Sequence, residues 1–233
     1  MLLGSYQLLL YDPLSFLLLV ALTALALVVA ITVHEFSHAL VANGLGDQTA
    51  KHQGRLSLNP IRHLDPGGSL MFLMAGFGWG KPVPVNQHQL SHGTTGMSLV
   101  AAAGPFSNLV VAFLMAIPIK VGLLDYTTLR VDRVTDLLSG GLDELLSAIL
   151  VLMILFNLLL AVFNLIPLAP LDGSRVLAVF IPRHREAGYA RFQRYGPVLL
   201  VTLIMMNYVL PFSLLSWVIG PVIDVLLSIA TGY

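Results

Sequence analysis

The sequence contains no cysteine, and it has unusually few charged residues. Only 10% of its 233 residues are Asp, Glu, Lys or Arg, whereas soluble domains have about 25%. The absence of cysteine excludes disulfides, thiolate nucleophiles and cysteine-ligated zinc. The shortage of charge excludes an ordinary soluble globule, because too few polar side chains are present to cover its surface. The net charge is zero, so we expect no nucleic-acid partner.

Long apolar runs are abundant instead. Apolar residues make up 57% of the chain, and four uncharged stretches are each long enough to cross a bilayer once as a helix. We therefore expect an all-α, polytopic membrane protein with a single domain over residues 1–233. Residues 1–11 should lie at the interface without forming a removable signal peptide, and the apolar segment 222–230 has no clear placement. The predicted spans cover about residues 14–42, 98–119, 145–165 and 198–219.

The positions of the basic residues predict the orientation of these spans. Nine Lys and Arg residues follow the first or the third span, whereas three lie between the second and the third. Basic loop residues favour the cytoplasmic side of a membrane. Both termini should therefore lie outside, with the ends of the first and third spans at the cytoplasmic face. The nine are Lys51, Arg55, Arg62, Lys81, Arg175, Arg183, Arg185, Arg191 and Arg194, and the three are Lys120, Arg130 and Arg133.

The end of the first span carries a motif with metal-binding spacing. Residues 34–38 read H-E-F-S-H within a predicted helix. Side chains four residues apart lie on one helical face, so His34 and His38 can direct ring nitrogens at one metal ion. Glu35 beside them can reach a water molecule at that metal. Ionisable residues in an apolar span are costly unless they are paired or bound, which favours a metal site over a chance match.

A third ligand is expected at Asp172, because a catalytic zinc site needs three protein ligands and an open position. Counting about 1.5 Å per residue along each span puts His34 and the end of the third apolar run at nearly the same depth. Pro167 and Pro170 prevent a regular helix after that run. Gly173 allows a sharp turn, so Asp172 can swing back toward the histidines. Taken alone, Asp172 would be interpreted as a solvated loop acid.

Together, these two motifs resemble those of a known family. H-E-F-S-H at residues 34–38, followed by N-L-I-P-L-A-P-L-D-G at 164–173, resembles the site-2 protease family of intramembrane zinc metalloproteases. The segments G-F-G-W-G-K-P-V-P-V-N at 76–86 and A-G-P-F-S-N at 103–108 are similar to that family as well. The resemblance covers roughly residues 33–175. The chain resembles a small form, without the inserted peptide-binding domain or the C-terminal regulatory domain of larger members.

The resemblance implies an intramembrane zinc endopeptidase that hydrolyses a peptide bond in or next to a transmembrane segment, near the cytoplasmic face. It implies that His34, His38 and Asp172 bind Zn²⁺ and that Glu35 is the catalytic base acting on a water at the metal. It also implies that Asn164 lies beside the metal and holds the substrate carbonyl, although an interhelical polar contact explains Asn164 equally well. The implied partners are a transmembrane protein substrate and the lipid bilayer, and the oligomeric state is left open. In a prokaryote the membrane would be the cytoplasmic one.

Residues 67–80 are uncharged, rich in glycine and too few to span the membrane as a helix. We expect a re-entrant or strand-like segment here, between the first and second spans, which could present an edge to an extended substrate. An interfacial loop is the alternative.

Other polar residues and a second function class have simpler expectations. Asn157 should make an interhelical contact, and Gly104 and Asn108 should serve close helix packing. The alternative function is a metal-binding membrane carrier or an inactive relative, in which the His, Glu and Asp residues form an ion path. A carrier would repeat such positions in several spans, commonly with inverted-repeat symmetry, and this chain shows no such repeat.

Overall fold

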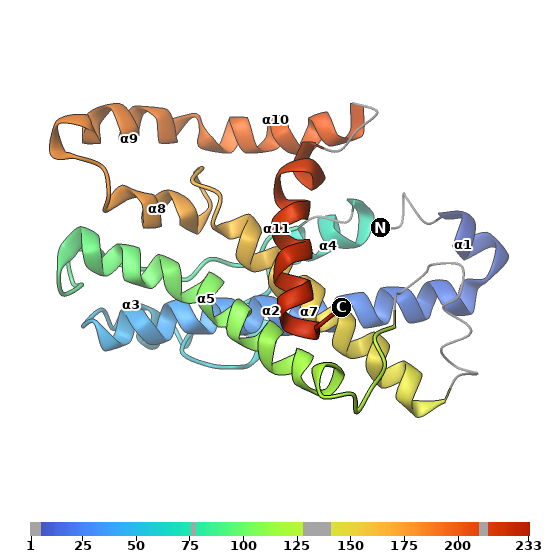
Figure 1. The fold of residues 1–233 in the computed structure, drawn as a ribbon. Coiled ribbons are helices and arrows are strands. Elements are labelled where there is room, and N and C mark those ends of the chain that lie inside the picture. The colour runs from blue at the N-terminus through green and yellow to red at the C-terminus, as the bar shows by residue number, and fades with distance from the viewer. Residues whose placement is uncertain (1–5, 76–77, 128–140, 210–213) are drawn as a thin grey trace.

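Figure 1 shows the computed structural model, which describes residues 6–75, 78–127, 141–209 and 214–233. Its described part consists of helices joined by loops, with one isolated β-bridge between Leu64 and Gly80. The helices are α1 (Tyr6–Tyr11), α2 (Pro13–Gly44), α3 (Thr49–His52), α4 (Pro66–Ala75), α5 (Gly93–Lys120), α7 (Leu142–Asn164), α8 (Asp172–Ala178), α9 (Glu186–Arg194), α10 (Gly196–Val209) and α11 (Leu214–Thr231), with single 3₁₀ turns η1 (Pro60–Arg62) and η3 (Arg183–Arg185).

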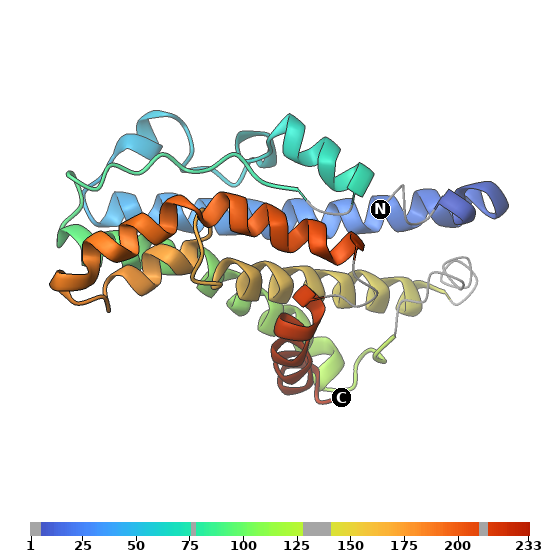
Figure 2. The same cartoon turned by 90° about the horizontal axis from the view of Figure 1, so that it is seen from above.

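Three of the described helices, α2, α5 and α7, are long and apolar enough to cross a membrane. Each packs against the other two, and together they form the centre of the molecule in Figures 1 and 2. Their bounds agree with the first three predicted spans within a few residues. At the interface between α5 and α7, buried Ala112 and Ala116 pack against Ile154 and Leu158. Small residues such as alanine let two membrane helices approach closely.

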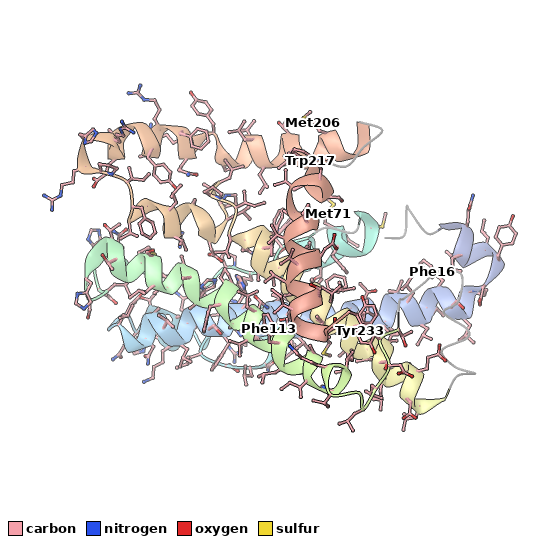
Figure 3. All side chains as sticks on the ribbon, in the orientation of Figure 1. Phe16, Met71, Phe113, Met206, Trp217 and Tyr233 are labelled. Atoms are coloured by element: carbon pink, nitrogen blue, oxygen red, sulfur yellow. The ribbon has the colours of Figure 1, made fainter. Side chains whose placement is uncertain are left out.

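The outer surface of the bundle is apolar, as expected for contact with lipid. Leu17 on α2, Phe106 on α5 and Trp217 on α11 are 61%, 67% and 76% exposed, and Trp217 is labelled in Figure 3. A soluble monomer rarely exposes so much large apolar surface. The start of the first span is determined locally, because the Asp12 carboxylate caps α2 by accepting a hydrogen bond from Ser15 N at 3.1 Å.

The fourth predicted span, residues 198–219, is not one helix. α10 ends at Val209 and α11 begins at Leu214, and residues 210–213 lie outside the described part. In Figure 1 the two helices run in different directions, with α11 crosswise to α10. The prediction of four spans is therefore not confirmed. The prediction treated residues 198–219 as one helix because the whole run is apolar. Pro211 falls within this run, and proline disfavours a continuous helix.

The strand-like alternative for residues 67–80 is wrong for its first part, because Pro66–Ala75 form the helix α4. Asp65 precedes α4, and its side chain accepts a hydrogen bond from Gly68 N at 2.8 Å. A Cβ added at Gly68 would collide with the backbone of Trp79, so this glycine allows the chain after α4 to fold back against the helix. Entry of this segment into the bilayer stays a prediction.

Candidate metal centre

His34 and His38 lie one turn apart on the buried face of α2. Their exposed fractions are only 5% and 7%, and their ring centroids are 4.6 Å apart in an edge-on arrangement. The Nε2 atoms of both rings approach the same carboxylate oxygen, Asp172 Oδ2, at 3.1 Å and 3.3 Å. The structure thus brings one acidic side chain to two imidazoles that precede it by more than a hundred residues.

The loop between α7 and α8 carries Asp172 back to the histidines. Asp172 is the first residue of α8. A Cβ on Gly173 would collide with the carbonyls of Leu165 and Ile166, so glycine is needed here for close approach of two backbone segments. The φ angle of Gly173 is not positive, unlike that of Gly141, so the close approach of the two segments, and not a left-handed backbone conformation, is what requires glycine here.

Helix α9 holds this segment in place through two side chains. The Gln193 amide accepts a hydrogen bond from Ala169 N at 2.7 Å and donates one to the Pro167 carbonyl at 3.1 Å. The Tyr189 hydroxyl donates to the Ser174 carbonyl at 2.5 Å. Both ends of the segment that carries the acid are therefore tied to α9.

Hydrogen bonds to the far side of each ring determine which nitrogen faces Asp172. His38 Nδ1 lies 2.7 Å from the Val100 carbonyl, which can only accept, so Nδ1 carries the proton. His34 Nδ1 lies 2.6 Å from Asn108 Oδ1. The Asn108 amide nitrogen donates to the Ala30 carbonyl at 3.0 Å, which orients the amide and leaves its oxygen to accept from His34. Both rings therefore present an Nε2 lone pair to the space beside Asp172.

This arrangement requires a cation. Two Nε2 lone pairs and a carboxylate oxygen are all acceptors, and the three ligand atoms lie within 4.8 Å of one another. Without a metal, only protonation of the rings relieves the repulsion. In that state burial raises the pKa of Asp172. The hydrogen bonds from His34 and His38 and the charge of the two rings lower it by more, so the pKa lies well below its ordinary value.

The space and the donor set both fit zinc. Ligands held at about 2.0–2.1 Å in a tetrahedral site lie about 3.3–3.4 Å apart, close to the 3.1 Å and 3.3 Å between the Nε2 atoms and Asp172 Oδ2. A Cβ added at Gly104 would lie 2.5 Å from His38 Nε2 and 2.7 Å from His34 Cε1. Only glycine leaves this space free. Two imidazoles and one carboxylate, with a position left open, are a known ligand set for catalytic zinc.

Glu35 lies next to this cluster, turned toward the loop that follows α4. Its Oε2 accepts a hydrogen bond from Val83 N at 3.1 Å. A Cβ added at Gly80 would lie 3.5 Å from Oε1, and Oε1 has no hydrogen-bond partner within the described part of the chain. One carboxylate oxygen is therefore fixed by the backbone, and the other is available to a proton.

Three asparagines on α5 and α7 were singled out in the sequence, and one of them has a different role from the one expected. Asn108, which we assigned to helix packing, contacts His34 directly. A carboxamide in an apolar span, at the depth of the histidines, was the signal that could have identified it. Asn157 does make the expected interhelical contact, because its Oδ1 accepts from Asn108 Nδ2 at 2.8 Å. Asn164 is half-buried and donates to the Leu160 carbonyl of its own helix at 2.9 Å, and no hydrogen bond within the described residues joins it to the cluster.

Comparison with known proteins shows the family to which the chain with this cluster belongs. The sequence model of peptidase family M50 matches residues 22–207, which contain the whole cluster. The chain belongs to peptidase family M50. It is therefore a zinc metalloprotease of the site-2 protease type and an integral membrane protein, with Zn²⁺ as its cofactor.

The alignments with similar proteins cover most of this M50 peptidase and most of each relative. YwhC of Bacillus subtilis, named as an inferred zinc metalloprotease, is 40% identical over 215 residues, which are 92% of this chain and 90% of YwhC. Rip2 of Mycobacterium tuberculosis, strain H37Rv, carries the same kind of name and is 28% identical over 83% of this chain and 70% of its own. Rip2 of Mycolicibacterium smegmatis is 27% identical over the same shares. No solved structure matches.

Proposed function

We propose that this M50 peptidase is an intramembrane endopeptidase, which hydrolyses a peptide bond in or next to a transmembrane segment of a membrane protein near the cytoplasmic face. The observation that carries the proposal is the meeting of three acceptor atoms beside a carboxylate with a free oxygen. His34, His38 and Asp172 are the proposed zinc ligands, and residues 1–233 form one domain.

Glu35 is the proposed general base. A bound zinc ion would supply Lewis acidity, which polarises the scissile carbonyl and lowers the pKa of a water molecule. Glu35 Oε1 takes the proton of the attacking water, and the same carboxyl group then gives a proton to the leaving amine nitrogen. The hydrogen bond from Val83 N holds the carboxylate in place during both transfers. Asn164 is proposed to donate a hydrogen bond to the oxygen of the scissile carbonyl, where charge develops.

The distribution of charge supports the proposed cytoplasmic position of the site. The basic residues after the first and third spans lie at the end of the molecule where α2 ends and α8 leads into α9, and Figure 3 shows nitrogen-bearing side chains gathered around α9. Basic segments of this kind stay on the cytoplasmic side. A substrate would therefore be cut close to that face, and in a prokaryote the membrane is the cytoplasmic one.

The substitution Glu35→Gln tests the proposal. It keeps the size of the side chain but removes the base, so cleavage should fall about 10²–10⁴-fold, the range for general acid–base catalysis. Membrane fractions from cells that express the original protein, Glu35→Gln or His34→Ala are compared by mass spectrometry of protein N-termini, and zinc is measured in each purified protein.

We expect new N-termini near transmembrane segments with the original protein and few or none with Glu35→Gln or His34→Ala. Zinc should remain bound in Glu35→Gln and be lost in His34→Ala. Glu186→Gln, an exposed position in the first turn of α9, is the matched control and should cleave normally. The same fragments from Glu35→Gln would contradict the role of Glu35, and no fragments from any protein would favour a carrier or an inactive relative.

A further inference from the structure

An apolar cavity of about 130 Å³ lies between α2 and α4. An engineered cavity of about 150 Å³ lined by Leu, Ile and Phe binds benzene, so this volume suits one branched aliphatic or phenyl side chain. Phe72 of α4 is buried in its wall at 6% exposure, whereas Trp79 at 51% exposure forms part of its rim. The cavity can therefore accept a group from outside the protein.

The cavity shares one face of α2 with Glu35. Ala24, Val28 and Ile31 line it, and Glu35 follows Ile31 by four residues, which places all four side chains on one side of the helix. At about 1.5 Å per residue, Ile31 lies about 6 Å from Glu35 along the axis. Gly80 lies between the cavity wall and Glu35, because a Cβ added there would lie 2.9 Å from Ile31 Cγ2 and 3.5 Å from Glu35 Oε1.

We propose that this cavity binds an apolar side chain of the substrate close to the scissile bond. The inference rests on the proposed function, since it takes Glu35 as the base. An extended peptide advances about 3.3 Å per residue, so the occupant belongs to a residue about two positions from the bond that is cut. The peptidase therefore selects Leu, Ile, Met or Phe at that position over Gly or a charged residue.

The lining excludes a polar occupant. Ser69 is the one hydroxyl-bearing side chain among the described residues of the wall, and the others there are aliphatic, aromatic or glycine. A polar group placed in such a site loses its hydrogen bonds to water and finds few replacements. A lipid acyl chain has the same chemistry as an apolar side chain, and the experiment below separates these two sources.

Peptide hydroxamates provide the test, because the hydroxamate binds zinc while one neighbouring side chain is varied from hydrogen to methyl, isobutyl and benzyl. Their Kd values are measured on the zinc-loaded protein in detergent. We expect the Kd to fall roughly 10- to 100-fold from hydrogen to isobutyl or benzyl, as for burial of one such side chain. Equal Kd values across the series would overturn the inference and leave the proposed function standing. If no compound binds the zinc-loaded protein, the metal centre and the inference fall together.

Two substitutions fill the cavity from opposite walls. Ala24→Phe from α2 and Ser69→Phe from α4 should each abolish the preference for large side chains. Ala21→Phe places the same group on the exposed side of α2 and should keep the preference. A preference that persists in both filled variants would overturn the proposal. Loss of the preference in the original protein on addition of phospholipid would assign the cavity to an acyl chain instead.

Discussion

A buried chain of hydrogen bonds connects the metal centre to the middle of α7. His34 donates to Asn108, Asn108 donates to Asn157, and Asn157 donates to the Met153 carbonyl at 2.8 Å. Both asparagines are fully buried. In a low-dielectric interior a satisfied chain of this kind holds each member in one orientation. Asn157 therefore orients the amide of Asn108, and Asn108 in turn determines which ring nitrogen of His34 carries the proton.

Asn108→Leu should weaken zinc binding about 10- to 100-fold, the usual cost of losing a partner of a metal-binding histidine. The leucine has a similar size but leaves His34 Nδ1 without its acceptor. Asn157→Leu should have a smaller effect in the same direction, because Asn108 stays in place but loses its restraint. The measurement is the zinc Kd in detergent by competition with a chelator.

Ser147→Ala is the control for loss of a buried polar group far from the site, since Ser147 donates to the Asp125 carbonyl at the other end of α7. It should bind zinc normally. An unchanged zinc Kd in Asn108→Leu would refute the orienting role.

At the scale of elements, Asp47 connects the end of α2 to the segment that leads into α5. Its fully buried carboxylate accepts hydrogen bonds from Thr49 N at 2.9 Å and from Asn86 N at 2.6 Å. Burial raises the pKa of Asp47, but these hydrogen bonds lower it more, so the pKa lies below its ordinary value. The segment that reaches Glu35 through Val83 is thereby anchored to the helix that carries Glu35.

This shift predicts how stability depends on pH. A carboxyl group whose pKa is lower in the folded state stabilises the protein above its unfolded pKa, about 3.9, and this contribution is lost as the pH falls through the folded value. Asp47→Asn should lower the free energy of unfolding at pH 7 by about 1.5–3 kcal/mol, because it removes hydrogen bonds to a charged group. Denaturant unfolding in detergent at several pH values measures this.

The difference between the original protein and Asp47→Asn should shrink as the pH falls below the ordinary carboxyl pKa. Asp143→Asn, at an exposed position in the first turn of α7, is the matched control and should leave the free energy of unfolding at pH 7 nearly unchanged. A constant difference between Asp47→Asn and the original protein from pH 7 to pH 3 would show that the charge of Asp47 is not what stabilises the loop.

At the scale of the whole molecule, the two ends of the bundle differ in charge. The end that holds α3, α8 and α9 carries most of the described basic residues, and the opposite end, where α5 finishes and α7 begins, carries Lys120. Arg130 and Arg133, which entered the prediction of orientation, lie outside the described residues. An asymmetry of Lys and Arg between the loops sets the orientation of a membrane protein.

The orientation can be measured cleanly because the chain has no native cysteine. His52→Cys and His184→Cys, both exposed at the basic end, should react with a membrane-impermeant maleimide only after the cells are permeabilised. Leu123→Cys, 76% exposed at the other end, should react in intact cells. The reverse labelling pattern would place the active site on the outer side.

Much of the fold and of the metal centre could be predicted from the sequence because these features follow local rules. The three spans follow from the length of apolar runs, and the pairing of His34 with His38 follows from the helical period. The position of Asp172 follows from the similar number of residues between the start of each span and the motif that it carries, and from the chain-breaking prolines. The helix at residues 66–75 and the division between α10 and α11 were missed, since a short apolar run has the same composition in a strand, a helix or part of a longer span.

The order of residues was enough to establish a membrane bundle, a pair of histidines with an acid at equal depth, and the family that uses them. The role of Asn108, the hold of Val83 on Glu35, and the cavity beside it depend on contacts between segments far apart in the chain. No local pattern carries that information, because a buried hydrogen bond or cavity exists only once separate helices have packed and excluded water or lipid.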